Sequence, residues 1–158
     1  MIRRSRLPGR PTERPNTNIV QVSRLGEVRT VERMSTERKT VPAAGNWGDI
    51  VGYSRAVRVG QTIHVAGTTA PGDDVGTQTA GALEIALKAI AELGGTREDV
   101  VRTRLFLTNI DEWEAAGRAH GEFFNAVRPA NTMLEVSRLI DPALLVEVEV
   151  EAILPEGR

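Results

Sequence analysis

The stretch from Val146 to Ala152 constrains the fold of this chain more than any other. Apolar residues alternate there with three glutamates, which is the pattern of a strand with one buried and one polar face. Side chains two residues apart on one strand face are about 6.5–7 Å apart. The carboxylates of Glu147, Glu149 and Glu151 therefore form a row that needs cations or water beside it. If the chain has a chemical site, we expect it here.

A second strand precedes this one. Pro129 cannot continue a helix, and it biases Arg128 towards extended structure. After it, Thr132, Leu134 and Val136 alternate with Asn131, Met133 and Glu135, a period-two pattern that again indicates a strand. The break at Asp141-Pro142 separates the two strands. Residues 128–152 are thus predicted to form two strands at the end of the folded body.

The body upstream alternates between strand and helix patterns. It contains two helices whose apolar residues recur at three- and four-residue steps, one ended by Gly94-Gly95 and one begun by Asn109, with Glu112 three positions on as in a capping box. The order predicts an α+β fold, a mixed sheet with two helices on one face. The predicted elements are a β-hairpin over 52–59 and 62–67, a helix over 77–93, a strand over 100–107 and a helix from 109 to about 127.

The second helix carries the aromatic residues Trp113, Phe123 and Phe124 at helical spacing, and we expect all three in the core. His120 lies on the same stripe, where we expect a packed histidine with a backbone partner.

Two helices cover only one face of a sheet, so the other face needs an explanation. We expect it to carry Met133, two arginines (Arg102 and Arg104) and the glutamate row. Three arrangements remain open: a solvated face, pairing of the arginine and glutamate rows across strands, or packing against copies of the same chain.

Composition excludes several kinds of site. The chain has no cysteine and two histidines far apart, so we expect no metal and no cofactor. No apolar run approaches the roughly 20 residues that span a bilayer, so we expect a cytoplasmic protein without a membrane partner. The charge is uneven: residues 1–40 hold ten Arg or Lys and four Glu, a net of +6, whereas residues 41–158 have a net of −7. The acidic body argues against a nucleic-acid partner.

Residues 1–40 are predicted to be a basic N-terminal extension, disordered where arginines and prolines interleave, and residues 41–158 the folded domain. A short strand or hairpin over 19–31 is the exception that the pattern allows. Two interpretations of the extension stay open. It is either a binding or targeting arm, or an upstream addition to a protein that naturally begins at Met34, and we favour the second.

Taken together, these residues resemble the RidA/YjgF/UK114 family over about 41–154. The resemblance rests on Gly52-Tyr53, Gly60, Ala66-Gly67, Gly121-Glu122-Phe123-Phe124, Arg128-Pro129-Ala130, Glu135-Val136-Ser137-Arg138-Leu139 and Val148-Glu149-Val150-Glu151-Ala152. It implies a chorismate-mutase-like fold and a homotrimer with a central barrel, helices outside and ligand pockets between subunits. It also implies a hydrolase that deaminates reactive imines or enamines, such as 2-aminoacrylate, to a keto acid and ammonia. The alternatives are a trimer that binds a metabolite without catalysis and, less favoured, the endoribonuclease or translation-inhibitor activity with which some members are labelled.

The resemblance also implies site residues. The water-positioning glutamate falls on Glu149, or on Glu147 if the alignment is anchored at Asp141-Pro142, and we favour Glu149. The arginine that grips a substrate carboxylate is replaced by Asn131, which indicates a divergent subgroup and altered substrate choice, because an amide cannot form the bidentate charged pair. Arg55, on the face of Tyr53 by period-two spacing, is a candidate substitute. The predicted substrate-binding residues are Tyr53, Arg55, Ala66, Gly67, Asn131 and Met133.

Overall fold

The structure is a computed structural model, and it describes residues 19–22, 28–31 and 37–157. The chain divides into two compact units, Met1–Ser35 and Thr36–Arg158. The elements are β1 (Ile19–Val22), β2 (Val28–Val31), β3 (Arg38–Pro42), α1 (Trp47–Val51), β4 (Ser54–Val59), β5 (Thr62–Thr68), α2 (Val75–Glu92), η1 (Arg97–Asp99), β6 (Val100–Leu107), η2 (Ile110–Glu112), α3 (Trp113–Phe124), β7 (Ala130–Glu135) and β8 (Val146–Ile153).

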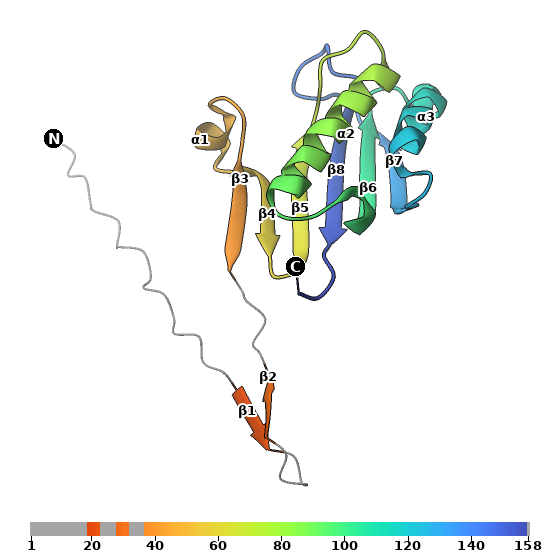
Figure 1. Ribbon diagram of the computed structural model, residues 1–158. Helices are drawn as coiled ribbons and strands as arrows, with labels where there is room; N and C mark the ends of the chain where they lie inside the picture. The colour runs from red at the N-terminus through yellow and green to blue at the C-terminus, as the bar shows by residue number, and fades with distance from the viewer. Residues whose placement is uncertain (1–18, 23–27, 32–36, 158) are drawn as a thin grey trace, which may run out of the picture. The chain divides into compact units, whose positions relative to one another are not determined.

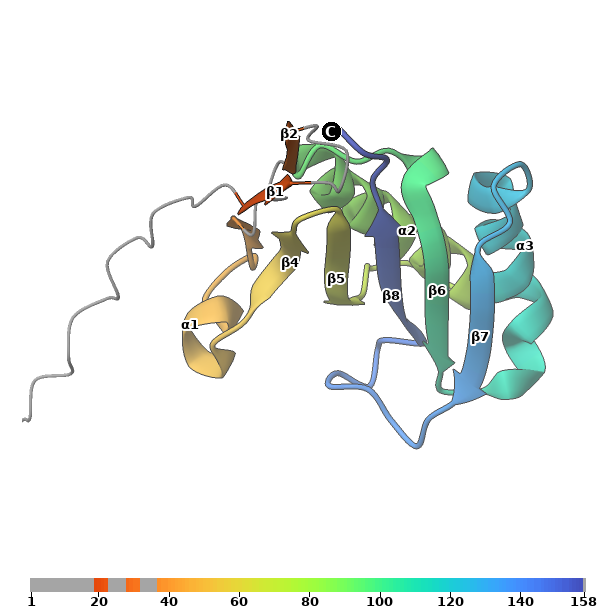
Figure 2. The same ribbon diagram turned by 90° about the horizontal axis from the view of Figure 1, so that it is seen from below.

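The second unit is built on a six-stranded mixed sheet in the order β3-β4-β5-β8-β6-β7. All neighbours are antiparallel except β6 and β7, which are parallel. Helices α2 and α3 lie side by side on one face of this sheet (Figures 1 and 2). The predicted α+β fold is therefore confirmed, and the trimer stays a prediction.

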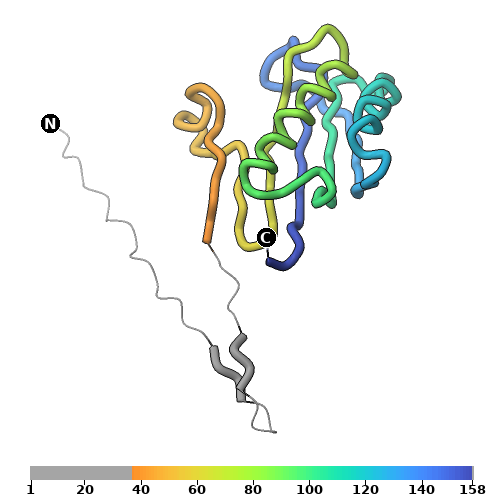
Figure 3. Tube along the Cα trace, viewed as in Figure 1, coloured from red at the N-terminus to blue at the C-terminus, as the bar shows by residue number. Residues whose placement is uncertain are grey.

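Strand β8 lies between β5 and β6, although it comes last in the chain (Figure 3). The residues of β8 that face the helices are almost completely buried, and the three glutamates between them are partly exposed on the other face. A fully buried valine side chain contributes about 1.5–3 kcal/mol. The side chains from β8 that belong to the core are Val146, Val148, Val150 and Ala152.

Helix α2 begins two residues before the predicted start and ends one residue before the predicted end. The Asp74 carboxylate accepts a 2.8 Å hydrogen bond from the Thr77 backbone N–H, which caps the N-terminus. At the other end, Gly94 has a φ of +86°, which glycine adopts without strain. The guanidinium of Arg58 on β4 donates to the free carbonyl of Leu93 at 2.7 Å.

The second helical segment differs from the prediction at its start. Asn109 caps the short helix η2 by accepting from the Asp111 N–H, and α3 begins only at Trp113. Phe124 is buried and Phe123 packs against the core, as predicted. Trp113 is 57% exposed, so its expected place in the core is wrong. It is the first residue of α3.

The predicted face of Met133 is also wrong. Strand β7 pairs in parallel with β6, and Met133 is opposite Leu105, whose side chain is completely buried. Met133 therefore packs against the core on the helix side. Since side chains alternate, an error of one residue in phase transfers a side chain to the opposite face.

Two observations concern the start of the chain. Strand β3 pairs with β4, so the sheet begins at Arg38, inside the segment assigned to the extension. Strands β1 and β2 pair with each other in antiparallel orientation, within the 19–31 segment where the pattern allowed a strand or hairpin. The predicted disorder of the arginine- and proline-rich residues 1–18 lies outside the described residues.

Gln78 fastens α2 to the loop that leads into β8. Its side chain is 2% exposed and makes three hydrogen bonds, to Gly72 O (3.1 Å), Ala143 O (2.9 Å) and the Leu145 N–H (2.8 Å). All three partners are backbone groups.

Gln78→Leu should therefore lower the free energy of unfolding by about 2–4 kcal/mol, because buried polar groups that lose a partner each cost roughly 1–3 kcal/mol. Urea unfolding at a fixed protein concentration measures the change. Glu84→Ala, at an exposed position of the same helix, is the control and should stay within about 0.5 kcal/mol. Equal losses for the two variants would contradict this role.

Candidate functional site

A bulge in β5 shapes the open face of the sheet, the face opposite the helices. The register between β5 and β8 shifts between Val65 and Thr68, so Ala66 and Gly67 together lie opposite a single residue of β8. The carboxylate of Glu147 lies over Gly67, and a Cβ at this position would overlap it. The close approach of this carboxylate to the backbone therefore depends on the glycine, because a side chain at position 67 would force the carboxylate to move.

Arg55 on β4 holds this bulge in place. Its Nη1 donates to Gly67 O at 2.8 Å and to the Thr68 hydroxyl at 2.9 Å, while that hydroxyl donates to Ala66 O at 2.7 Å. Its Nη2 is 3.4 Å from the Tyr53 hydroxyl, and its central carbon Cζ is 5.8 Å from the centre of the Tyr53 ring. Tyr53, which directly precedes β4, and Arg55 are thus part of one network around the bulge.

Glu147 is the carboxyl group with the altered proton affinity. Burial raises the pKa of Glu147, and repulsion from Glu149 raises it further, whereas the positive charge of Arg55 lowers it. Within the described part of the chain, no hydrogen bond or ion pair within 4 Å holds the carboxyl group. A half-buried carboxyl group with a raised pKa and no such partner is suited to exchange a proton with a ligand.

Glu149, the favoured glutamate, has a strong partner. Arg104 on β6 donates to Glu149 Oε2 at 2.7 Å and to Glu151 at 3.0 Å, so the arginine and glutamate rows pair across strands. This was one of the three arrangements left open for this face. Among the described residues, nothing donates to the other oxygen of Glu149, Oε1, which leaves it available to water or a ligand.

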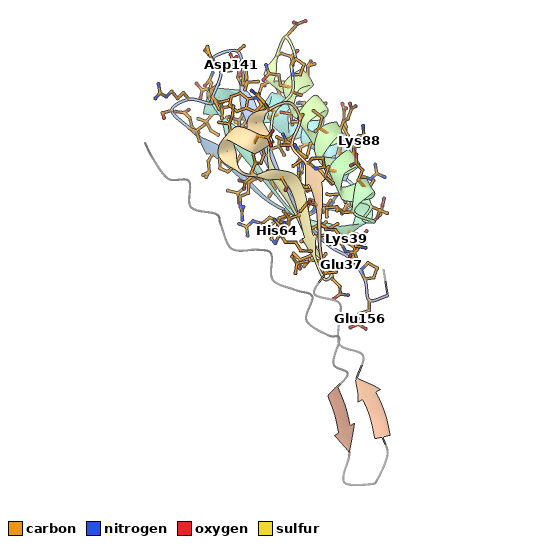
Figure 4. All side chains as sticks on the ribbon, turned by 90° about the vertical axis from the view of Figure 1, so that its left-hand side faces the viewer. Glu37, Lys39, His64, Lys88, Asp141 and Glu156 are labelled. Carbon is orange, nitrogen blue, oxygen red and sulfur yellow. The ribbon has the colours of Figure 1, made fainter. Side chains whose placement is uncertain are left out.

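His64 lies on the same open face, opposite Glu151 in the register of β5 and β8. Figure 4 shows it on the other side of the sheet from Lys88 of α2.

Asn131 belongs to a different network, on the helix side of the sheet. Its Nδ2 donates to the Thr103 hydroxyl at 3.0 Å, and that hydroxyl is 2.9 Å from Nε2 of His120 on α3. Burial lowers the pKa of His120, whose ring also lies 4.8 Å from that of Phe124. The expected backbone partner of His120 is therefore wrong, because a side chain takes that role.

The predicted site residues thus fall into two groups. One group, on the open face around the bulge, comprises Tyr53, Arg55, Ala66, Gly67, Glu147 and Glu149. The other group, Asn131 and Met133, lies on the helix side of the edge strand β7. Opposite faces of one sheet cannot line one pocket, so a single chain does not bring the two groups together.

Sequence inspection missed two polar partners. Thr68 carries no recognisable signal. Thr103 is completely buried, and a polar residue at an inward position of a strand is the signal that could have drawn attention to it. Arg104 was expected on the open face, and the structure decides that it pairs with Glu149 and Glu151.

Comparisons with known proteins agree with this geometry. A family model described as Endoribonuclease L-PSP matches residues 46–154. An uncharacterized protein of Streptomyces coelicolor is 44% identical over 121 residues, 72% of this chain and 90% of its own length. A RutC family protein of Pyrococcus abyssi is 32% identical over 110 residues, 64% of this chain and 84% of its own length. A solved member of the YjgF/YER057c/UK114 family from Mycobacterium tuberculosis has a TM-score of 0.73 at 44% identity, covering 75% of this chain and all of its own.

The chain belongs to the RidA/YjgF/UK114 family. The family match runs from just before α1 to the end of β8, so it includes the bulge, the glutamate row and Asn131. In the described ranges of this RidA-family chain, no group of three or more His, Cys, Asp or Glu residues could hold a metal ion. No helix in those ranges is both long and apolar enough to cross a membrane.

Glu147→Gln should change the pH dependence of stability. Burial raises the pKa of Glu147 above its ordinary 4.5, so the folded state binds the proton more tightly than the unfolded state does. Stability therefore falls as pH rises through the raised pKa. Glutamine stays neutral, so the variant should have a higher Tm than the wild type at pH 8, and the gain should vanish below about pH 4.

Thermal unfolding over this pH range measures the effect. Glu122→Gln, on the exposed surface of α3, is the matched control. A similar pH-dependent gain in the control would contradict the assignment to Glu147.

Proposed function

We propose that this chain is a hydrolytic deaminase of small imines or enamines, which acts as a homotrimer in clefts between subunits. The observation that carries the proposal is the pair of carboxyl groups on β8. Glu147 has a raised pKa and, among the residues that the structure describes, no hydrogen-bond or ion-pair partner, and Glu149 is held by Arg104 with one oxygen available. Two neighbouring carboxyl groups in unlike environments are suited to divide a hydrolysis between them.

The mechanism follows from these environments. Glu149 Oε1 holds a water molecule, and the water oxygen attacks the imine carbon while Glu147 takes the proton that the water loses. Glu147 then returns this proton to the nitrogen, which gives a carbinolamine. The hydroxyl proton of the carbinolamine passes to the nitrogen as the carbonyl group forms, and the C–N bond breaks, so that ammonia leaves with both electrons of that bond. General acid–base catalysis of this kind contributes typically 10²–10⁴-fold.

The cleft between subunits is supported by the two faces of the sheet. Asn131 and Met133 lie on the helix side of an edge strand, whereas Glu147 and Glu149 lie on the open face. A second copy of the chain, with its β7 edge against the bulge, would bring both groups to one ligand. The Tyr53 ring and the backbone of Ala66 and Gly67 would complete the wall on the open-face side.

A second function, metabolite binding without catalysis, has its own support. The Arg104 ion pair partly neutralises Glu149, and Asn131 lacks the charge that would grip a carboxylate. Endoribonuclease activity, the description attached to the family model, is not favoured, because residues 41–158 have a net charge of −7 and RNA backbones are anionic. A cytoplasmic location and direct substrate binding by Arg55 stay predictions.

Replacing either carboxyl group should slow deamination. Glu147→Gln and Glu149→Gln should each lower kcat for ammonia release by about 10²–10⁴-fold, because the first removes the group that takes and returns the proton and the second removes the carboxylate that holds the water. A coupled assay for ammonia with 2-aminoacrylate and a panel of other imines measures the rates. Glu151→Gln, the third glutamate of the row, is the control and should lose less than about tenfold. Unchanged rates in both of the first two variants would remove this mechanism.

Restoring an arginine at position 131 should restore selection for carboxylates. Hydrogen bonds to charged groups are worth about 1.5–3 kcal/mol, so Asn131→Arg should raise kcat/KM for 2-aminoacrylate about 10- to 100-fold. Asn131→Lys is the matched control, since lysine adds the same charge without the bidentate fork and should gain less. Equal gains for the two variants would mean that charge alone is responsible, and the absence of any gain would exclude position 131 from the pocket.

A further inference from the structure

The Asn131–Thr103–His120 network fixes the orientation of an exposed amide. Thr103 is completely buried, and its hydroxyl already accepts a hydrogen bond from Asn131 Nδ2 at 3.0 Å. A buried hydroxyl proton needs an acceptor of its own. Within the part of the chain that the structure describes, the ring nitrogen Nε2 of His120, at 2.9 Å, is the one acceptor in reach.

This chain of bonds has a definite direction. Thr103 donates to Nε2, so His120 is neutral with its proton on Nδ1. Thr103 can then receive Asn131 only through the amide nitrogen. The Asn131 side chain is thereby held with one N–H on Thr103, and its Oδ1 and second N–H remain for a ligand. Asn131 is exposed, and no described residue bonds to Oδ1.

We infer that the Thr103–His120 pair is a positioning device that makes Asn131 select a ligand with a neutral carboxamide rather than a carboxylate. A carboxamide offers one donor to Oδ1 and one acceptor to the free N–H, so both groups of Asn131 are satisfied. A carboxylate offers acceptors only, and one of its oxygens would face Oδ1. An unmatched polar group in a desolvated contact is what makes sites of this kind selective.

The selectivity for a carboxamide names a substrate class for the proposed deaminase. It rests on the proposed function only in that the bound molecule is then a substrate. If the chain is an enzyme, the favoured substrate is an imine or enamine that carries a carboxamide next to the reacting carbon. If it only binds metabolites, the same selectivity holds for the ligand.

The first test is structural and independent of catalysis. Long-range ¹H–¹⁵N correlation spectra of the full chain identify which ring nitrogen of His120 carries the proton. At neutral pH we expect Nδ1 to be protonated and Nε2 to be bare. A protonated Nε2 would overturn the inference, because the Thr103 proton would then point to Asn131 and the amide would be reversed.

The second test is binding of a matched pair of probes, pyruvamide and pyruvate, followed through the side-chain amide signals of Asn131. We expect the full chain to bind pyruvamide at least about tenfold more tightly than pyruvate. Thr103→Val should bring this ratio close to one, because the amide is then free to turn, and Thr103→Ser should retain it. Equal affinities in the wild type, or a ratio unchanged in Thr103→Val, would overturn the inference.

The two proposals fail in different ways. Absence of ammonia release from any imine would reject the deaminase but leave the probe preference and the His120 tautomer as they are. Conversely, active deamination of 2-aminoacrylate with no preference for its carboxamide analogue would reject the inference and leave the deaminase standing.

Discussion

Strand β8 has one face in the core and one face of glutamates, and the arrangement of the rest of the sheet depends on placing both faces. Its valines close the core under α2, while its glutamates face away from the helices. Arg104 compensates two of these charges by bonding Glu149 and Glu151, in a partly exposed pair that contributes modestly to stability. Glu147 is left without such a pair. The sheet therefore keeps one carboxyl group poorly compensated, and that group is the best candidate for chemistry.

Gly67, in the bulge of β5, explains why Glu147 can lie where it does. Any other residue at position 67 would place a Cβ on the carboxylate, which would then have to move. Arg55 donates a hydrogen bond to the carbonyl of Gly67. Arg55 thus has a structural role that does not depend on any ligand. Its hydrogen bond to Gly67 also keeps its positive charge near Glu147.

Division of the predicted site between two faces is the main consequence for function. Asn131 is oriented by Thr103 and His120 on the helix side of the sheet, whereas the glutamates lie on the open face. Each half is internally ordered by its own hydrogen bonds. An active pocket that uses both halves needs a second copy of the chain, which is the arrangement that the family resemblance implied.

The sequence by itself determined the fold class, the two helices and the alternation of β8, because these depend on periodicity within one segment. It also indicated the glutamate row and the exchange of arginine for Asn131. Only the tertiary structure decided the phase of β7, the exposure of Trp113 and the partners of Glu149 and Asn131. Those properties depend on the register between strands and on bonds between residues that are 28 and 45 positions apart in the chain. A pattern within one segment does not carry that information, since it fixes which residues share a face but not what that face meets.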